Sequence, residues 1–508
     1  MKKALLDVTP NKILKNLFGV IMKKIKNISV ILLVAFIVCT SFCFYGCSSV
    51  KQQRSTYQID CTFEDNKISG TETVNFYNHT ENAFSSLKFN LFGNAFREDA
   101  KFKPIATEYA SKAYYKGNSY GSTNVLSVKS VGENLEFSIG GDDQNILVVE
   151  LPEKIYPGES VSVTIDFITT LANVISRTGI NEKTVNLGNF YPILCGIMGE
   201  SFYECVYYST GDPFYSDCAD YDVSITLDSN YTLASSGKQK SKTNIGDKVR
   251  YNYEGENIRS FAVVMSKEFK VQKDSSTGVD IFYYYYDDSE PLTALKTAVQ
   301  SIEFFSQTFG SYPYSTYSVV QTKFIQGGME YPALSMISDE LEAKAYNEVI
   351  VHETAHQWWL VSVGNNEIEY GFLDEGLAEY SVVVFYENHS EYGLNRNALI
   401  KSSEMTYKNF CSIYDKLYNN VNTTMIRSLD EFSSEYEYVN IAYVKPCIMY
   451  DNLRSALGEE KFFNSLRSYY KEFQFKNATP DDLIGAFEKC GLDANGFFQS
   501  FFTGKAII

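Results

Sequence analysis

Hydrophobic and polar residues alternate over much of the chain between residues 56 and 275. The clearest run steps by two through Val161, Val163, Ile165 and Phe167, and similar runs cover 87–91 and 223–227. Turn-forming residues such as Pro157-Gly158 separate the runs. A period of two is typical of strands that bury one face and leave the other in water. The pattern therefore predicts an all-β, antiparallel domain over residues 56–275.

The hydrophobic period changes after Ile281. A strand-like run covers 281–286, and a helix is expected to begin at Pro291, whose fixed φ suits a first helical turn, and to end at Gly310. Further helices are expected over about 341–361 and from near Asp374 onward. The predicted fold class is α+β and multidomain, in which the β domain is followed by a mainly helical domain over 276–508.

The first 47 residues have the order of an export signal. Three lysines between residues 23 and 26 precede an apolar run over 28–38, and small and polar residues follow. Gly46-Cys47 after this run resembles the lipobox of bacterial lipoproteins, so we expect a lipid on Cys47. The alternative is an uncleaved membrane anchor, because 28–46 is about long enough to cross a bilayer.

Both alternatives have the same consequence for the remainder of the chain. Residues 1–47 form the signal or anchor segment, and 48–55 form a short polar linker. The rest of the chain is expected at the extracytoplasmic face of the cell membrane, with the membrane as a partner through the N-terminal segment.

Length and charge restrict the remaining partners. The chain has 508 residues, enough for two or three domains. Its formal net charge is −17, whereas binding to nucleic-acid phosphates needs concentrated Lys and Arg. We therefore expect no nucleic-acid partner, and the sequence does not indicate an oligomeric state.

The strongest chemical signal is the run His352-Glu353-Thr354-Ala355-His356. On a helix, residues four apart lie on one face, so both imidazoles can bind one ion. Zinc accepts imidazole nitrogen, and Glu353 beside the first histidine can take a proton from a water at the ion. Because the chain has only four histidines, a chance match to this pattern is improbable. Glu375, nineteen residues after His356, can supply the third ligand, which predicts one zinc ion per chain.

Three segments in order resemble the aminopeptidase N family of gluzincins. The first is Gly327-Gly328-Met329-Glu330, the second is the metal motif followed by Asp374-Glu375-Gly376-Leu377-Ala378-Glu379-Tyr380, and the third is Ile441-Ala442-Tyr443-Val444-Lys445-Pro446. Two positions depart from the family pattern, namely Tyr331 in place of Asn and Pro446 in place of Gly. The resemblance implies a thermolysin-like catalytic domain.

The resemblance also implies roles for individual residues. Glu330 would bind the α-ammonium group of the substrate, with Gly328 and Met329 lying along the substrate backbone. Tyr443 would share with zinc the negative charge that develops on the attacked carbonyl oxygen. Tyr438 is the alternative phenol, for which a packing role is expected.

The family's second anchor for the α-ammonium, a Gln or Glu in the β domain, has no match here. Asn189-Phe190-Tyr191-Pro192 and Gly211-Asp212-Pro213-Phe214 occupy that stretch instead. The family's long helical roof domain also has no match, which predicts an open cleft.

The expected function is a zinc aminopeptidase that removes N-terminal residues from extracellular peptides. The alternatives are a zinc endopeptidase with an open cleft and a non-catalytic surface binding protein with a peptidase-like fold.

Overall fold

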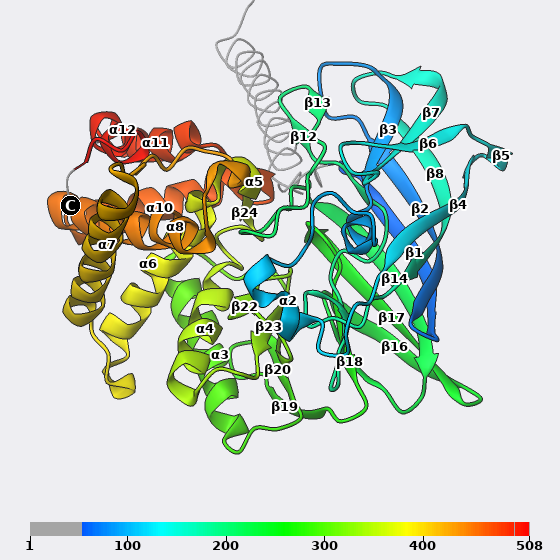
Figure 1. The fold of residues 1–508 in the computed structure, drawn as a ribbon, viewed down its shortest axis with the longest axis horizontal. Coiled ribbons are helices and arrows are strands. Elements are labelled where there is room, and N and C mark those ends of the chain that lie inside the picture. Colours follow the sequence, from blue (N-terminus) through cyan, green and yellow to red (C-terminus); the bar gives the residue numbers. More distant parts are fainter. Residues whose placement is uncertain (1–52, 492, 507–508) are drawn as a thin grey trace, which may run out of the picture. The chain divides into compact units, whose positions relative to one another are not determined.

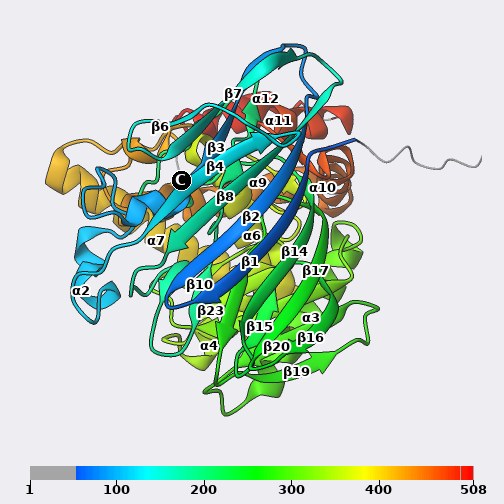
Figure 2. The same ribbon diagram turned by 90° about the vertical axis from the view of Figure 1, so that its right-hand side faces the viewer.

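The computed structural model describes residues 53–491 and 493–506. An eight-stranded sheet forms most of the β-rich half, in the order β16-β17-β14-β1-β2-β8-β4-β5. Figure 2 shows most of these strands side by side. Their bounds are β1 Thr56–Glu64, β2 Lys67–Tyr77, β4 Ser122–Ser130, β5 Glu133–Asn134, β8 Ser160–Thr170, β14 Ala219–Asp228, β16 Lys238–Ile245 and β17 Lys248–Ile258.

Alternation explains why these segments form strands. In β1 the residues Tyr57, Ile59, Cys61 and Phe63 are buried, and the residues between them face solvent or are half-buried. Neighbouring strands pair antiparallel except β1 and β14, which pair in parallel with Thr56 beside Asp220. The parallel pair needs a long connection, and residues 65–218 provide it.

Two four-stranded sheets and a hairpin complete the β-rich half. The first sheet has the order β15-β18-β10-β9, with β9 Thr178–Ile180, β10 Val185–Leu187, β15 Thr232–Ser235 and β18 Val263–Ser266. The second has the order β11-β3-β7-β6, with β3 Phe84–Asn90, β6 Phe137–Gly140, β7 Ile146–Ile155 and β11 Ile193–Leu194. The hairpin pairs β12 Ile197–Met198 with β13 Ser201–Phe202, and the short helices here are η1 Phe92–Phe96, η2 Thr107–Tyr109 and α2 Ala110–Ala113.

A five-stranded mixed sheet supports the metal motif. Its order is β19-β20-β21-β23-β22, with β19 Lys270–Asp274, β20 Asp280–Tyr285, β21 Thr316–Thr322, β22 Gly328–Met329 and β23 Leu334–Ser338. Helices α3 Pro291–Thr308 and α4 Ala343–Ala355 pack against it. As the sequence predicts, α3 begins at Pro291, and the chain turns at Gly310 with φ +140°.

The remaining residues are mainly helical and gather away from the large sheet in Figure 1. They form α5 Glu367–Tyr370, α6 Phe372–Asn388, η3 Ser390–Tyr392, α7 Arg396–Tyr418, η4 Leu429–Glu431, α8 Glu435–Val439, η5 Asn440–Val444, α9 Lys445–Leu457, α10 Glu459–Phe473, α11 Pro480–Lys489 and α12 Asn495–Phe502. The short strands β24 Val363–Gly364 and β25 Lys476–Asn477 pair in parallel. This order, a β-rich half followed by a helical half, agrees with the α+β class predicted from the sequence.

Arg259 ties the two halves together. It follows β17, and its guanidinium donates hydrogen bonds to the carbonyl oxygens of Leu360 (2.7 Å) and Lys476 (2.7 Å) in the helical half. It also donates to the carbonyl oxygen of Ser216 (2.9 Å) on its own side. One buried side chain therefore fixes the β-rich half against the segment that follows the metal helix.

Within the described ranges, no helix combines the length and apolar composition that crossing a membrane requires. The predicted signal or anchor segment, including Cys47, lies outside these ranges.

Candidate active site

Two helices bring the three predicted metal ligands together. Helix α4 carries His352 in its last turn, and His356 directly follows its last residue, so the two imidazoles lie one turn apart with their Nε2 atoms 3.0 Å from each other. Glu375 comes from the first turn of α6, and its Oε2 lies 3.2 Å from the Nε2 of each histidine. The three donor atoms thus form a nearly equilateral triangle.

This triangle fits a zinc ion. Ligand atoms about 2.0–2.1 Å from a tetrahedral ion lie roughly 3.3 Å apart, close to the separations seen here. The donors are two imidazoles and one carboxylate, a set typical of catalytic zinc with a fourth position left for water. His352, His356 and Glu375 would hold the ion.

Neighbouring groups orient both imidazoles. His356 Nδ1 lies 2.9 Å from the carbonyl oxygen of Trp359, and His352 Nδ1 lies 3.3 Å from a carboxylate oxygen of Glu379. Such contacts on the second ring nitrogen fix the tautomer that presents Nε2 to a metal. Asp374 lies behind His356 and accepts a hydrogen bond of 2.7 Å from Asn365.

Burial and charge set the pKa values of this donor set. Burial raises the pKa of Glu375, but the two imidazoles outweigh burial and bring it down to about 2. Burial lowers the pKa of His352, whereas its contacts with Glu375 and Glu379 raise it to about 10. These pKa values correspond to protonated imidazoles beside an ionised Glu375 carboxylate. A divalent cation that binds here would displace the protons from the imidazoles and supply positive charge in their place.

Glu353 lies beside the donors and is nearly inaccessible, with 5% of its surface exposed. Burial raises its pKa to about 7, against the lowering effect of the two histidines. Its Oε2 has no hydrogen-bond partner among the described residues. A carboxylate with a pKa near neutrality and a free oxygen is suited to accept and return a proton.

The strand β22 runs past Glu353. A Cβ added to Gly328 would lie 2.3 Å from Glu353 Oε1, so glycine is what allows this approach. Met329 is buried, and Glu330 follows it with 4% of its surface exposed. An oxygen of Glu330 and a nitrogen of His356 lie within 4.8 Å of each other, which places Glu330 next to the metal donors.

Gln357, the residue after the metal motif, holds the segment that carries Glu330. Its side chain donates to the carbonyl oxygen of Tyr331 (3.2 Å) and accepts from the backbone N–H of Ala333 (2.8 Å). Tyr331 takes the place of the family's Asn, and it belongs to a buried hydrophobic cluster that also contains Met329 and Leu334. The substitution leaves Glu330 beside the donors.

Tyr443 reaches the donors from the other side of the cleft. It lies in η5, a π-helical turn, and such turns are frequent at functional sites. Its hydroxyl donates a hydrogen bond to Glu375 Oε1, and its ring is stacked 5.8 Å from that of His352. Pro446, in place of the family's Gly, lies in the first turn of α9 and packs against Gly376 of α6.

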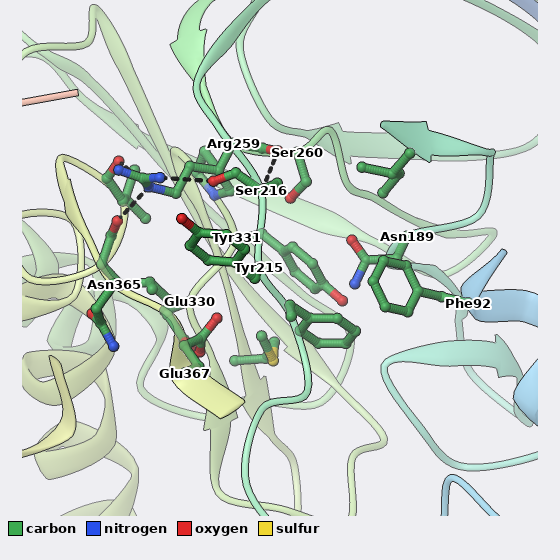
Figure 3. Close-up of a pocket in the computed structure, with 16 residues that line it drawn as sticks. Phe92, Asn189, Tyr215, Ser216, Arg259, Ser260, Glu330, Tyr331, Asn365 and Glu367 are labelled. Carbon is green, nitrogen blue, oxygen red and sulfur yellow. Dashed lines mark hydrogen bonds between the residues drawn. The ribbon is translucent and has the colours of Figure 1, made fainter. Parts of the chain in front are cut away.

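Two carboxylates that were not predicted as site residues lie close to Glu330. One is Asp212, in the loop before β14, and the other is Glu367, the first residue of α5. One oxygen each from Asp212, Glu330 and Glu367 lie within 4.8 Å of one another. Figure 3 shows Glu330 and Glu367 next to each other at a cavity that Tyr215, Ser216 and Arg259 also line.

The acidic residues near Glu330 have raised pKa values. Burial raises the pKa of Glu330, of Glu367 and of Asp212, and each is raised further by its acidic neighbours. Arg177 opposes this at Asp212, to which its guanidinium donates a hydrogen bond. Sequence reasoning could note Asp212 in the Gly-Asp-Pro-Phe stretch, but only the fold brings it to Glu330.

The fold and the donor set of two histidines and one glutamate are those expected of a gluzincin, a zinc metallopeptidase with one catalytic zinc. Residues 293–501 match the model of the peptidase family M1 domain. This match agrees with the resemblance to the aminopeptidase N family that the sequence motifs indicate.

Curated relatives agree with this assignment. The chain is 26% identical over 253 residues to endoplasmic reticulum aminopeptidase 2 of Homo sapiens. The aligned stretch covers 46% of this chain and 25% of the relative. It is 26% identical over 262 residues to aminopeptidase N of Lactococcus lactis subsp. lactis, which covers 47% of this chain and 29% of that relative. The chain thus spans about a quarter of the length of such relatives.

Solved structures match over almost the whole fold. The M1 zinc metallopeptidase from Deinococcus radiodurans superposes with a TM-score of 0.65 at 15% identity, over 90% of this chain and 96% of that one. A mutant of that protein bound to a Tyr-Ser-Ala substrate gives a TM-score of 0.62 at 16% identity, with the same coverage. The β-rich half followed by a mainly helical half is therefore the fold of a known M1 metallopeptidase.

Proposed function

We propose that this chain is a zinc-dependent aminopeptidase that removes single residues from the N-terminus of peptides. The observation that carries the proposal is Glu330, a buried carboxylate that lines the same cleft as the zinc donors. Its Oε1 has no hydrogen-bond partner in the described part of the chain. A carboxyl group at a fixed place beside the metal suits a substrate ammonium group, whose positive charge favours the ionised form of Glu330, and so sets the cut one residue from the end.

The chain's own residues divide the chemistry among them. Zinc, when bound by the three donors, supplies a Lewis acid that polarises the peptide carbonyl and makes water more acidic. Glu353 accepts the proton of the attacking water and returns it to the leaving amine. The hydroxyl of Tyr443 donates a hydrogen bond to the carbonyl oxygen as negative charge develops there.

A small cavity behind Glu330 also supports an exopeptidase. It has a volume of about 50 Å³, room for a few water molecules and not for a further stretch of peptide. A substrate chain that enters from the cleft would therefore end at Glu330. The Tyr-Ser-Ala substrate named for the Deinococcus radiodurans structure is a short peptide of the kind such a site would accept.

Substitution of Glu353 tests the proposal. Glu353→Gln keeps the size of the side chain but cannot accept the proton, so we expect about one zinc per chain and no measurable hydrolysis of an alanine p-nitroanilide. The wild-type chain should lose this hydrolysis to a chelator and regain it with added zinc. A zinc-loaded Glu353→Gln protein with wild-type turnover would overturn the assignment of the base.

We further propose that the N-terminal segment holds the chain at the extracytoplasmic face of the membrane through a lipid on Cys47. The support is the apolar run followed by Gly46-Cys47. Mass spectrometry of the mature N-terminus of protein purified from membranes should find a lipidated Cys47. An unmodified peptide that spans residues 45–50 would support the membrane-anchor alternative instead.

A further inference from the structure

The cleft extends past the metal donors on the side away from Glu330. Glu330 lies beside His356, whereas an oxygen of Glu379 lies 3.3 Å from Nδ1 of His352. The two histidines are one turn apart on α4, and Glu348 lies one further turn before His352. A substrate whose N-terminus is at Glu330 therefore crosses the donors and continues toward Glu348. The side chain that it places there belongs to the first residue after the cleaved bond.

Two helix faces form the walls of this part of the cleft. Residues three or four apart lie on one face of a helix, and α4 packs against α6, as Figure 1 shows. In this part of the cleft each face combines apolar side chains with one carboxylate. The lining residues are Ala345, Glu348 and Val349 on α4, Glu379 and Val382 on α6, and Leu399 on α7. Such walls suit a side chain with a long aliphatic stem and a charged end.

The charge of Glu348 is only weakly compensated within the protein. Glu348 forms an ion pair with Lys344 at 3.9 Å, but the lysine side chain is 70% exposed, and such surface pairs contribute little. Burial raises the pKa of Glu348, Lys344 opposes burial, and Glu379 raises the pKa further. A cation that enters the pocket would favour the ionised carboxylate and pair with it.

A buried hydroxyl group lies near Glu348. Tyr386 follows Glu379 by seven residues on α6, which is two turns along the same face. It is 1% exposed, and its hydroxyl has no hydrogen-bond partner among the described residues. The charge of Glu348 adds to burial in raising the pKa of Tyr386, which places the hydroxyl and the carboxylate near each other. Because buried polar atoms are rarely left without partners, this hydroxyl oxygen is available to an N–H group of a ligand that reaches Glu348.

We propose that Glu348 is a specificity-determining residue, which together with Glu379 binds the cationic end of a lysine or arginine at the first residue after the cleaved bond. This deepens the proposed aminopeptidase function and rests on it. The apolar walls hold the aliphatic stem, and Glu348 accepts hydrogen bonds from the ammonium or guanidinium at its end. Glu379 contributes negative charge, since one of its oxygens is already in contact with His352. The enzyme is then expected to release an N-terminal residue fastest where lysine or arginine follows it.

The test uses peptides of the form Ala-Xaa-Ala-Ser that differ only in Xaa. Lysine and norleucine have the same four-carbon stem, so the ratio of their kcat/KM values isolates the ammonium group. Hydrogen bonds to a charged group have strengths that correspond to a roughly ten- to hundredfold effect on kcat/KM. Because the Glu348 side chain is 35% exposed, we expect the lower end of this range, a preference for lysine of about tenfold. Glu348→Gln should bring the ratio to about one.

Two further variants make the test specific. Glu348→Lys should reverse the preference, so that the peptide with glutamate at Xaa is cleaved faster than the one with lysine, a result that misfolding cannot produce. Glu404→Gln is the matched control, because Glu404 forms a similar ion pair with Lys408 at 3.8 Å on α7, and the described residues that line the cleft do not include it. Its ratio should equal that of the wild type. Equal kcat/KM for lysine and norleucine in the wild type, or an unchanged ratio in Glu348→Gln, would overturn the proposal.

Mass spectrometry of the products separates this proposal from the proposed function. Release of alanine alone supports the aminopeptidase function, whereas the ratio between peptides tests the pocket at Glu348. If longer peptides are cut only at internal bonds, the proposed function fails. A preference for lysine or arginine directly after the cut, removed by Glu348→Gln, would still support the pocket in that case. Release of N-terminal residues without any such preference would keep the function and overturn the proposal.

Discussion

At the scale of single residues, Tyr443 offers a sharp test of the chemistry. Its hydroxyl donates to Glu375 Oε1, and burial raises its pKa well above the usual range, so it stays a donor throughout the working pH range. Tyr443→Phe removes that donor and little else. Loss of one oxyanion donor typically costs about 10²–10³ in kcat, and we expect this loss with zinc content unchanged.

Tyr438→Phe is the control for that experiment. Tyr438 is buried beside Gly211 and Gly371, and its ring lies 5.8 Å from that of Tyr443. This is the packing role expected from the sequence, so kcat should change little. A near-normal kcat in Tyr443→Phe together with a large loss in Tyr438→Phe would exchange the two roles.

Local spacing explains which site residues the sequence could indicate. His352, Glu353 and His356 lie within about one turn at the end of α4, and Glu375 follows nineteen residues later in the first turn of α6. Their short separation in the sequence therefore already indicates that they lie close together. Asp212 meets Glu330 only because a loop of the β-rich half reaches the cleft. No periodicity along the chain carries that information.

At the scale of elements, strand β2 carries a carboxylic acid side chain in an apolar environment. Glu72 is 0% exposed, and neither of its oxygens has a hydrogen-bond partner among the described residues. It lies between Ile59 of β1 and Ile165 of β8 in the sheet. Burial raises its pKa well above the usual value, so Glu72 is neutral in the folded chain over a wide range of pH.

This predicts a pH-dependent stability that one substitution removes. Above the ordinary Glu pKa of 4.5 the unfolded chain releases the Glu72 proton while the folded chain keeps it. Folding stability therefore falls as pH rises, by up to about 1.4 kcal/mol per pH unit from this residue, until the folded pKa is reached. Glu72→Gln should match wild type near pH 4 and become the more stable chain as pH rises.

Urea denaturation of both proteins from pH 4 to pH 7 measures this difference. Comparing the two chains at each pH cancels the titration of groups that they share. A difference in stability that stays constant with pH would show that Glu72 ionises in the fold, contrary to its burial.

Helix and strand boundaries depend partly on contacts that the sequence does not display. The sequence pattern predicts a helical stretch over about 341–361, but α4 ends at Ala355. The chain then turns, with Leu360 at φ +128° and a bridge between Trp359 and Val363. Arg259 holds this turn through the carbonyl oxygen of Leu360. The period of hydrophobic residues alone cannot signal a turn fixed by a distant arginine.

At the scale of the whole molecule, both halves line the cleft of the candidate active site. The helical half contributes the expected zinc ligands, Glu353 and Tyr443 to its lining, and the β-rich half contributes Asp212 and Arg177. The sequence predicts each half as a class of structure, because alternation and helical periodicity are local. How the halves meet depends on buried contacts such as those of Arg259, which join residues far apart in the chain.

The central claim is that the enzyme needs a free N-terminus. The most direct measurement compares one peptide with a free and an N-acetylated terminus, with products identified by mass spectrometry. The proposed function predicts release of single N-terminal residues from the free peptide and almost no cleavage of the acetylated one. Equal cleavage of both, at internal bonds, would contradict it and make the chain an endopeptidase.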